Sequence, residues 1–521
     1  MQGKFASKKT REKAPEKANG KFKRVLESYK IEADNVEVEV DIVDDKDSFV
    51  KGYFLNIPEY GPGTHALLDS LKGSIISEAT IEAEKMFDVR FVSSLKEKFS
   101  KRAEAILQKE LPDITPEIKN TLIGMLLQEM LGLGRIEFLL NDANLEEIVI
   151  NTSAEPMWVY HRKYGWLKTN ISVNQENDIQ NYASIIARRV GKQITILNPL
   201  LDAHLITGDR ANATLFPISG KGNTLTIRRF RREPWTVTDF IENGTATAEV
   251  MALVWMAMEY ELNMIVSGGT ASGKTSFLNV CMPFIQPNHR IISIEDTREL
   301  LMPDFLHWVP LTTREPNPEG KGGVDMLDLL VNSLRMRPDR IIVGEVRRQR
   351  EAEVMFEGMH TGHSVYTTVH ADTAEETIHR LTNPPISVPP SMLTTVHLNV
   401  VMFRNRRMGV RRVLQVAEYI PEKRTEELEI VKPNTLYRWK ATNDTIAKHA
   451  ESIRLNDELG LYTGMSQDEI ARELKIKQAV LRWMVEKKIH AINDVGKLMA
   501  LYYKNREEII KMVRENKKPE L

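Results

Sequence analysis

The spacing of apolar and polar positions divides the chain into regions of different kinds. Between residues 236 and 420, short apolar runs such as LNMIVS, RIISI and RIIVG alternate with stretches that have the apolar spacing of a helix. Apolar runs of this length predict buried strands, and their alternation with helices predicts a mostly parallel sheet. We therefore expect an α/β domain here, at residues 234–421, after a linker near Pro234.

Two regions with mixed patterns precede this domain. Residues 34–112 contain the alternating run VEVEVDIV and then helical periodicity, which predicts a small leading α+β domain. Residues 113–233 begin with the helix-start signal Thr115-Pro116-Glu117 and continue with several alternating runs. This second region is expected to form an α+β N-terminal domain.

The two ends of the chain are more strongly charged. The first 30 residues carry ten Lys or Arg, three Asp or Glu and few large apolar side chains, so residues 1–33 are expected to form a disordered basic tail. A solvated tail is favoured over an anchor for acidic lipid or a partner. Residues 422–521 are predicted to form a helical C-terminal extension. Within it, SQDEIARELKIKQAVLRWMVEKKI has the rhythm of a helix-turn-helix, but its weak positive charge favours packing over DNA binding.

The overall composition limits the class of protein. The chain has 521 residues, of which 42% are hydrophobic and 27% charged, and its net charge is −1. These values are typical of globular domains and exclude a chain-wide attraction to nucleic acid. The single cysteine, Cys281, excludes an internal disulfide and a zinc site built from cysteine pairs. No apolar run approaches the roughly 18–20 residues that span a bilayer, so a cytoplasmic location is expected.

A phosphate-binding motif follows the run LNMIVS. The sequence GGTASGKT fits the P-loop pattern GxxxxGK[ST], and the apolar helix that follows completes the strand–loop–helix context. The glycines let backbone N–H groups approach phosphate oxygens, Lys274 would reach the β- and γ-phosphates of ATP, and the Thr275 hydroxyl would ligate Mg²⁺. The residues expected around the nucleotide are Gly268, Gly269, Thr270, Ala271, Ser272, Gly273, Lys274, Thr275 and Ser276.

Acidic residues end two of the predicted strands. RIISI is followed by Glu295-Asp296, and RIIVGEVR contains Glu345. An acid at a strand end beside the nucleotide can hold metal or polarise water. Glu345 is the favoured water-activating residue, and Glu295 is expected to support metal or water. Glu295 and Glu345 join Thr275 as candidate Mg²⁺ ligands, whereas helix capping suits Asp296.

Histidines and arginines complete the candidate chemistry. His363 and His370 flank the strand SVYTTV, and the pattern leaves sensing of the γ-phosphate and simple packing equally open. Several arginines could neutralise charge in the transition state if another domain or subunit supplies them, although a surface ion pair is the default role of any one. The principal candidates are Arg210, Arg228 and Arg229.

Four motifs in order carry a resemblance to a known family. They are GGTASGKT, SIEDTREL, RIIVGEVR and TGHSVYTTVHA, which resemble the Walker A, aspartate, Walker B and histidine boxes of the type II/type IV secretion ATPase superfamily. The resemblance covers about Glu129 to Glu418 and is strongest to the archaeal branch, in phrases such as SLRMRPDRIIVGEVR. The chain lacks the four-cysteine module of bacterial type II enzymes, and Arg348 stands where most members have glycine.

This resemblance implies a fold and a function. It implies a RecA-like P-loop ATPase domain preceded by an α+β domain, assembled as a homo-hexameric ring, with ATP held between the two domains. Arg210, Arg228 and Arg229 would close over the nucleotide. The ring would act at the cytoplasmic face of a membrane on a polytopic platform protein, and so power assembly or export of pilin-like or secreted substrates.

Two alternatives compete with this motor. A conjugation-type or nucleic-acid translocating ATPase would share the ring but predicts a basic, aromatic-lined channel, which residues 236–420 do not suggest. Direct binding of nucleic acid is therefore not expected. A ring protein that uses ATP only as a switch predicts loss of Lys274, Glu345 or the histidines, yet all are present.

Overall fold

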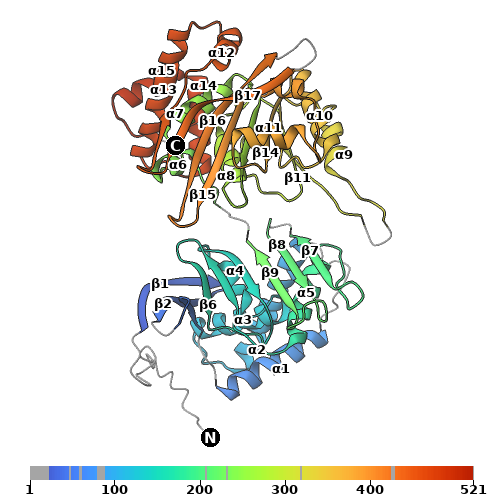
Figure 1. Ribbon diagram of the computed structural model, residues 1–521. Coiled ribbons are helices and arrows are strands. Elements are labelled where there is room, and N and C mark those ends of the chain that lie inside the picture. Colours follow the sequence, from blue (N-terminus) through green and yellow to red (C-terminus); the bar gives the residue numbers. More distant parts are fainter. Residues whose placement is uncertain are drawn as a thin grey trace. The chain divides into compact units, whose positions relative to one another are not determined.

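The computed structural model describes residues 23–45, 48–57, 61–78, 89–205, 208–229, 233–316, 320–423 and 429–519. The chain divides between Arg231 and Arg232 into two compact units. In the described residues, each unit is built on a sheet of nine strands (Figure 1). None of the described helices is long and apolar enough to cross a membrane.

The sheet of the first unit is antiparallel except where β3 runs parallel to β6. Its helices are α1 (Pro62–Glu78), α2 (Val89–Glu110), α3 (Pro116–Leu131), α4 (Ile136–Asn141) and α5 (Glu176–Arg189). Across the sheet the order is β1 (Lys23–Ala33), β2 (Val36–Asp45), β3 (Gly52–Asn56), β6 (Gly165–Thr169), β5 (Trp158–His161), β4 (Leu145–Ile150), β9 (Thr224–Arg228), β8 (Arg210–Thr214) and β7 (Leu200–His204).

The start of the chain departs from expectation in two ways. Residues 1–22 lie outside the described residues, but Lys23–Ala33 forms strand β1, so the predicted disordered tail is wrong for this part. Asp34 and Asn35 adopt left-handed φ values of 47° and 64°, which these residue types tolerate, and so turn β1 back onto β2. The leading region and the region after it also share one sheet, rather than forming the two domains expected.

The sheet of the second unit has a parallel part and an antiparallel part. The six parallel strands, in spatial order, are β12 (Trp308–Thr312), β11 (Ile291–Glu295), β13 (Arg340–Val343), β14 (Ser364–Val369), β10 (Met264–Gly268) and β15 (Leu398–Asn405). The antiparallel strands β16 (Val410–Lys423), β17 (Glu429–Lys440) and β18 (Thr445–Lys448) extend this sheet. The strand that precedes the P-loop, β10, therefore lies inside the sheet, and the predicted α/β RecA-like class is confirmed.

Alternate residues of β10 explain why its sequence is apolar throughout. Met264 and Val266 join one hydrophobic core, and Ile265 joins another on the opposite face of the sheet. The first core includes α6 (Val237–Glu242), α7 (Ala248–Glu259), α8 (Lys274–Cys281) and the C-terminal helices. The second includes α9 (Met326–Ser333), α10 (Gln349–His360) and α11 (Ala374–Thr382).

The C-terminal region is helical only in its later part. β17 and β18 replace the helices expected directly after residue 422, because apolar side chains of β17, such as Leu436 and Tyr437, are buried in the first core. The helices are α12 (Leu455–Thr463), α13 (Gln467–Glu486), α14 (Ile492–Lys504) and α15 (Arg506–Arg514). Most of the segment with helix-turn-helix rhythm forms one helix, α13, with no turn inside it, since it contains no Gly or Pro. Apolar side chains of α13 join the first core, in line with the favoured packing role.

Candidate nucleotide-binding site

The loop between β10 and α8 has the backbone shape that its glycines allow. Gly268 and Gly273 have φ values of 149° and 98°, a region that side chains disfavour. A Cβ atom at Gly268 would clash with the carbonyl oxygen of Met402, and one at Gly269 would lie 2.7 Å from Oδ1 of Asp372. At these glycines the loop therefore presents bare backbone, and it leads into the N-terminus of α8, which is suited to an anion.

Lys274 lies against this loop. Its side chain is largely buried, and Nζ donates hydrogen bonds to the carbonyl oxygens of Gly268 at 2.9 Å and Gly269 at 3.0 Å. Burial lowers the pKa of Lys274, while the nearby carboxylates of Glu345 and Asp372 oppose that shift. Thr275 follows in the first turn of α8 and is half-buried. The residues present thus fit a phosphate chain bound with Mg²⁺.

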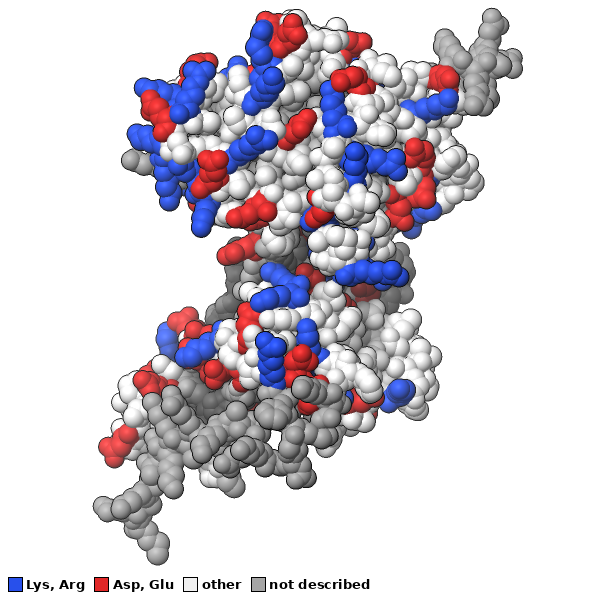
Figure 2. All heavy atoms as spheres, turned by 60° about the vertical axis from the view of Figure 1, so that its left-hand side comes forward, with Lys and Arg blue, Asp and Glu red and all other residues white. Residues whose placement is uncertain are grey.

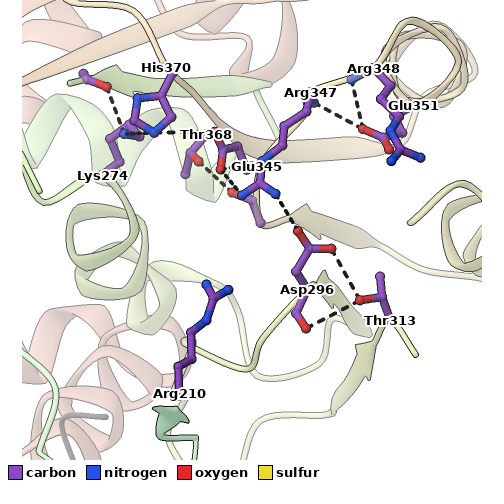
Figure 3. Close-up of polar contacts among 12 residues, drawn as sticks. Arg210, Lys274, Asp296, Thr313, Glu345, Arg347, Arg348, Glu351, Thr368 and His370 are labelled. Carbon is purple, nitrogen blue, oxygen red and sulfur yellow. Dashed lines mark hydrogen bonds and ion pairs between the residues drawn. The ribbon is translucent and has the colours of Figure 1, made fainter. Parts of the chain in front are cut away.

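His370 and Glu345 meet Lys274 at the same edge of the sheet. They follow β14 and β13, which run parallel to β10, so the carboxyl ends of the three strands lie together. Nε2 of His370 is 3.4 Å from Nζ of Lys274 and 3.6 Å from Oε1 of Glu345 (Figure 3). Burial, and then the charge of Lys274, lower the pKa of His370. A neutral imidazole therefore separates the ammonium group from the carboxylate near pH 7.

Arg347 connects two acids at this edge. Its guanidinium binds Oε2 of Glu345 through Nε at 3.0 Å and Nη2 at 2.6 Å, and its Nη1 binds Oδ2 of Asp296 at 3.0 Å (Figure 3). The carboxylate of Glu351 accepts the backbone N–H groups of Arg347 and Arg348 at 3.2 and 3.1 Å, at the start of α10. Side-chain and backbone contacts together therefore fix where Glu345 points.

Glu295 and Asp296, although adjacent, have different environments. Glu295 is 2% exposed, and its Oε1 accepts the N–H groups of Glu299 at 2.9 Å and Leu300 at 3.1 Å. Its buried Oε2 has no hydrogen-bond partner among the described residues, and burial raises its pKa to about 7. Asp296 does not begin a helix, so its predicted capping role is wrong; it binds Arg347 instead.

His363 lies apart from these residues within one chain. It precedes β14, whereas His370 follows it, and the six residues between them span about 20 Å in an extended strand. Nδ1 of His363 is 3.2 Å from Oγ1 of Thr361 and 3.3 Å from the carbonyl oxygen of Gly358. Only His370 is thus brought to the P-loop within one chain.

The three candidate arginines belong to the first unit. Arg210 and Arg228 lie opposite one another on β8 and β9. Nη2 of Arg210 is 3.6 Å from Oδ2 of Asp202, and Arg228 is exposed. Nη1 of Arg229 instead contacts the backbone carbonyl of Asp142. Arg210 and Arg228 thus present their side chains at the sheet surface, and Arg229 ties two segments of its own unit together.

Sequence reasoning missed two residues of the site. Arg347 stands inside the motif RIIVGEVR, but only the acid of that motif was assigned a role. Asp372 follows His370 by two residues and approaches Gly269 of the P-loop. An acidic residue two positions after His370 is the sequence signal that could have identified Asp372 as part of the site.

The chain is similar to known proteins over much of its length. The family model described as "Type II/IV secretion system protein" matches residues 209–459. "Uncharacterized protein MJ0900" of Methanocaldococcus jannaschii is 34% identical over 398 residues, covering 75% of this chain and 71% of that protein. "Putative conjugal transfer protein MT3759" of Mycobacterium tuberculosis is 31% identical over 262 residues, covering 49% of this chain and 73% of that protein.

A solved structure is less informative about this chain than the two sequence relatives. The Legionella pneumophila ATPase DotB is 18% identical, with 72% of this chain and 92% of that chain covered. Its TM-score is 0.40, too low to support any argument. The two sequence relatives have higher sequence identity to this chain, and one of them comes from an archaeon, in line with the archaeal resemblance. The chain therefore belongs to the type II/IV secretion system protein family.

Proposed function

We propose that this protein is an ATPase that binds ATP with Mg²⁺ at the P-loop and hydrolyses it. The observation that supports this most directly is the convergence of Lys274, His370 and Glu345 beside the glycine cradle. A cation beside the phosphate-binding loop and an oriented carboxylate that can position water are groups that support phosphoryl transfer to water.

Each residue has a distinct task in this proposal. Lys274 neutralises the β- and γ-phosphates, and the N–H groups of the loop and of α8 hold their oxygens. Mg²⁺, held by Thr275 with help from Glu295 or Glu345, supplies positive charge to the phosphate oxygens. Oε1 of Glu345 orients the attacking water, and His370 lies next to it to report on the γ-phosphate.

The work done by this ATPase is proposed from the family. A homo-hexamer would close the first unit over each nucleotide, with Arg210 and Arg228 reaching the phosphates, and open after hydrolysis. The ring would act at the cytoplasmic face of a membrane on a polytopic platform protein. Through it, the ring would power assembly of type IV pilus-like filament subunits or export of secreted proteins.

A conjugation-type motor is the second candidate, because relatives are described as conjugal transfer proteins. If such a motor gripped nucleic acid, a broad basic surface would be expected. Figure 2 instead shows Lys and Arg interspersed with Asp and Glu over the visible face. The segment with helix-turn-helix rhythm forms one helix, α13, with buried apolar side chains, which supports packing over DNA binding. The filament or secretion motor is therefore favoured.

The test begins with the purified full-length protein. We expect Mg²⁺-dependent phosphate release from ATP, its loss in Lys274→Ala, and a hexamer by mass measurement in solution. Phosphate release that persists unchanged in Lys274→Ala would place the activity elsewhere. A crosslinked pull-down from native membranes, with Glu345→Gln bound to ATP, should recover a polytopic membrane protein and filament subunits. Recovery of nucleic acid alone would favour the second candidate.

A further inference from the structure

Arg411 lies on the flank of the P-loop that faces away from the catalytic strands. Strand β15 pairs with β10, placing Met402 opposite Gly268, and then turns back as β16. Arg411 is the second residue of β16. Its Nε donates a hydrogen bond to the carbonyl oxygen of Ala271 at 3.2 Å, and its Cδ lies 3.6 Å from where a Cβ on Gly273 would be.

The charge of Arg411 is not neutralised within the part of the chain that the structure describes. No carboxylate there forms an ion pair with it, and its two terminal nitrogens have no hydrogen-bond partner there. The next residue, Arg412, points to the other face of the strand, is buried, and binds both carboxylate oxygens of Asp444 at 2.8 Å. Arg412 thus has a structural role that Arg411 does not share.

The orientation expected for a nucleotide at the P-loop follows from the strands on either side of β10. Glu345 and His370 come from β13 and β14, so hydrolysis and the γ-phosphate belong on that flank. The phosphate chain lies along the loop, and β15 and β16 occupy the other side of β10. A nucleotide bound at the P-loop would then have its α-phosphate and nucleoside on the flank where Arg411 stands.

We propose that Arg411 is a nucleotide-binding residue that neutralises the α-phosphate, so that Lys274 and Arg411 hold the two ends of the phosphate chain. This rests on the proposed function, because it presumes that the P-loop binds ATP. Arg411 then contributes to affinity for any nucleotide with an α-phosphate and does not take part in the chemical step. A guanidinium is suited to this, since it pairs with phosphate through planar N–H donors.

The test measures binding of ATP and ADP to the full-length protein. In Arg411→Ala we expect the Kd of both nucleotides to rise by about tenfold and by the same factor, as for loss of one charge-assisted hydrogen bond. Arg406→Ala is the matched control, because Arg406 is an exposed arginine at the tip of the same hairpin. A rise for ATP alone would show contact with the γ-phosphate and overturn the proposal, as would an unchanged ADP affinity.

Two further variants separate binding from a merely structural role. Arg411→Lys keeps the charge, whereas Arg411→Gln keeps only a neutral donor for the carbonyl of Ala271. Rescue by Lys and not by Gln supports contact with the phosphate; equal rescue by both would make the bond to Ala271 the whole role of Arg411 and refute the proposal. If the unaltered protein bound neither nucleotide, the proposed function itself would fail, whereas tight binding unaffected by Arg411→Ala would reject this inference alone.

Discussion

The guanidinium of Arg347 donates two hydrogen bonds to one oxygen of Glu345, Nε at 3.0 Å and Nη2 at 2.6 Å to Oε2. The other oxygen, Oε1, is thereby left toward His370, at 3.6 Å from its Nε2. The remaining nitrogen of Arg347, Nη1, donates a hydrogen bond to Oδ2 of Asp296. One arginine thus fixes the rotamer of the carboxylate that we assign to water activation.

Replacing Glu345 by Gln should abolish turnover and preserve binding. Glutamine keeps the shape of the side chain but cannot accept a proton, so we expect kcat to fall by at least about 100-fold. The Kd for ADP should stay within about twofold. Phosphate release and nucleotide binding measure the two effects, and Glu357→Gln, an exposed glutamate of α10, is the control. Unchanged turnover would transfer the role to Glu295.

Replacing Arg347 by Ala should lower kcat by about tenfold with little change in ADP affinity, because Glu345 loses its orientation rather than its charge. Arg347→Lys should restore little, since one ammonium group cannot bind Glu345 twice and Asp296 as well. The neighbouring Arg348→Ala provides the control, because Arg348 contacts Glu351 through its backbone N–H, which alanine keeps. Full recovery in the lysine variant would contradict a positioning role.

The arginines of the first unit should separate into two classes. Arg228 is exposed, and Arg228→Ala is expected to slow hydrolysis without changing the unfolding of the first unit. Arg229 donates to backbone carbonyls of Asp142 and Leu145, so Arg229→Ala should destabilise that unit by about 1–3 kcal/mol. Denaturant unfolding and steady-state kinetics measure the two effects. Equal loss of stability in both variants would refute the distinction.

His397 should make the stability of the second unit depend on pH. Burial lowers its pKa from 6.5 to about 4, and its Nδ1 accepts the backbone N–H of Asn263 at 3.0 Å. Because the unfolded chain binds a proton below pH 6.5 and the folded one does not, stability falls as pH drops from 6.5 toward 4. The loss at pH 5 is about 2 kcal/mol.

The measurement is denaturant unfolding at pH 7 and pH 5. His397→Asn keeps an acceptor near Nδ1 and cannot titrate, so its stability should fall less than that of the unaltered chain over this interval. An equal fall in both proteins would show that other groups account for the dependence.

Lys477 should anchor α13 to α7. Its side chain is fully buried, pairs with Glu259, and lies 4.1 Å from the ring centre of Trp255. Lys477→Ala leaves Glu259 and Glu473 without this cation and should reduce the free energy of unfolding by about 3–5 kcal/mol. Lys475→Ala, exposed on the same helix, should cost less than about 0.5 kcal/mol. Similar values for the two variants would contradict the anchoring role.

Local sequence signals explain both the successes and the errors of prediction. The strand before the P-loop was predicted correctly, and the glycines after it have φ values that favour glycine, because an apolar run and a glycine motif are local signals. The class of the second unit followed from the alternation of apolar runs. Charge counting failed at Lys23–Ala33, since pairing with β2 stabilises a strand that composition disfavours. It failed again after residue 422, where the sheet continues.

The sequence by itself determined the family, the P-loop and the identity of the acids and histidines, because these are properties of residue types at short spacing. Only the tertiary structure decided which of them meet. Arg347 binds Asp296 across 51 positions, Arg411 reaches the P-loop across 140, and Lys477 pairs with Glu259 across 218. Such contacts depend on strand order, which brings the ends of β10, β13 and β14 together and leaves His363 at the opposite edge. Periodicity along a chain fixes which face a side chain occupies, but not its neighbour across the sheet.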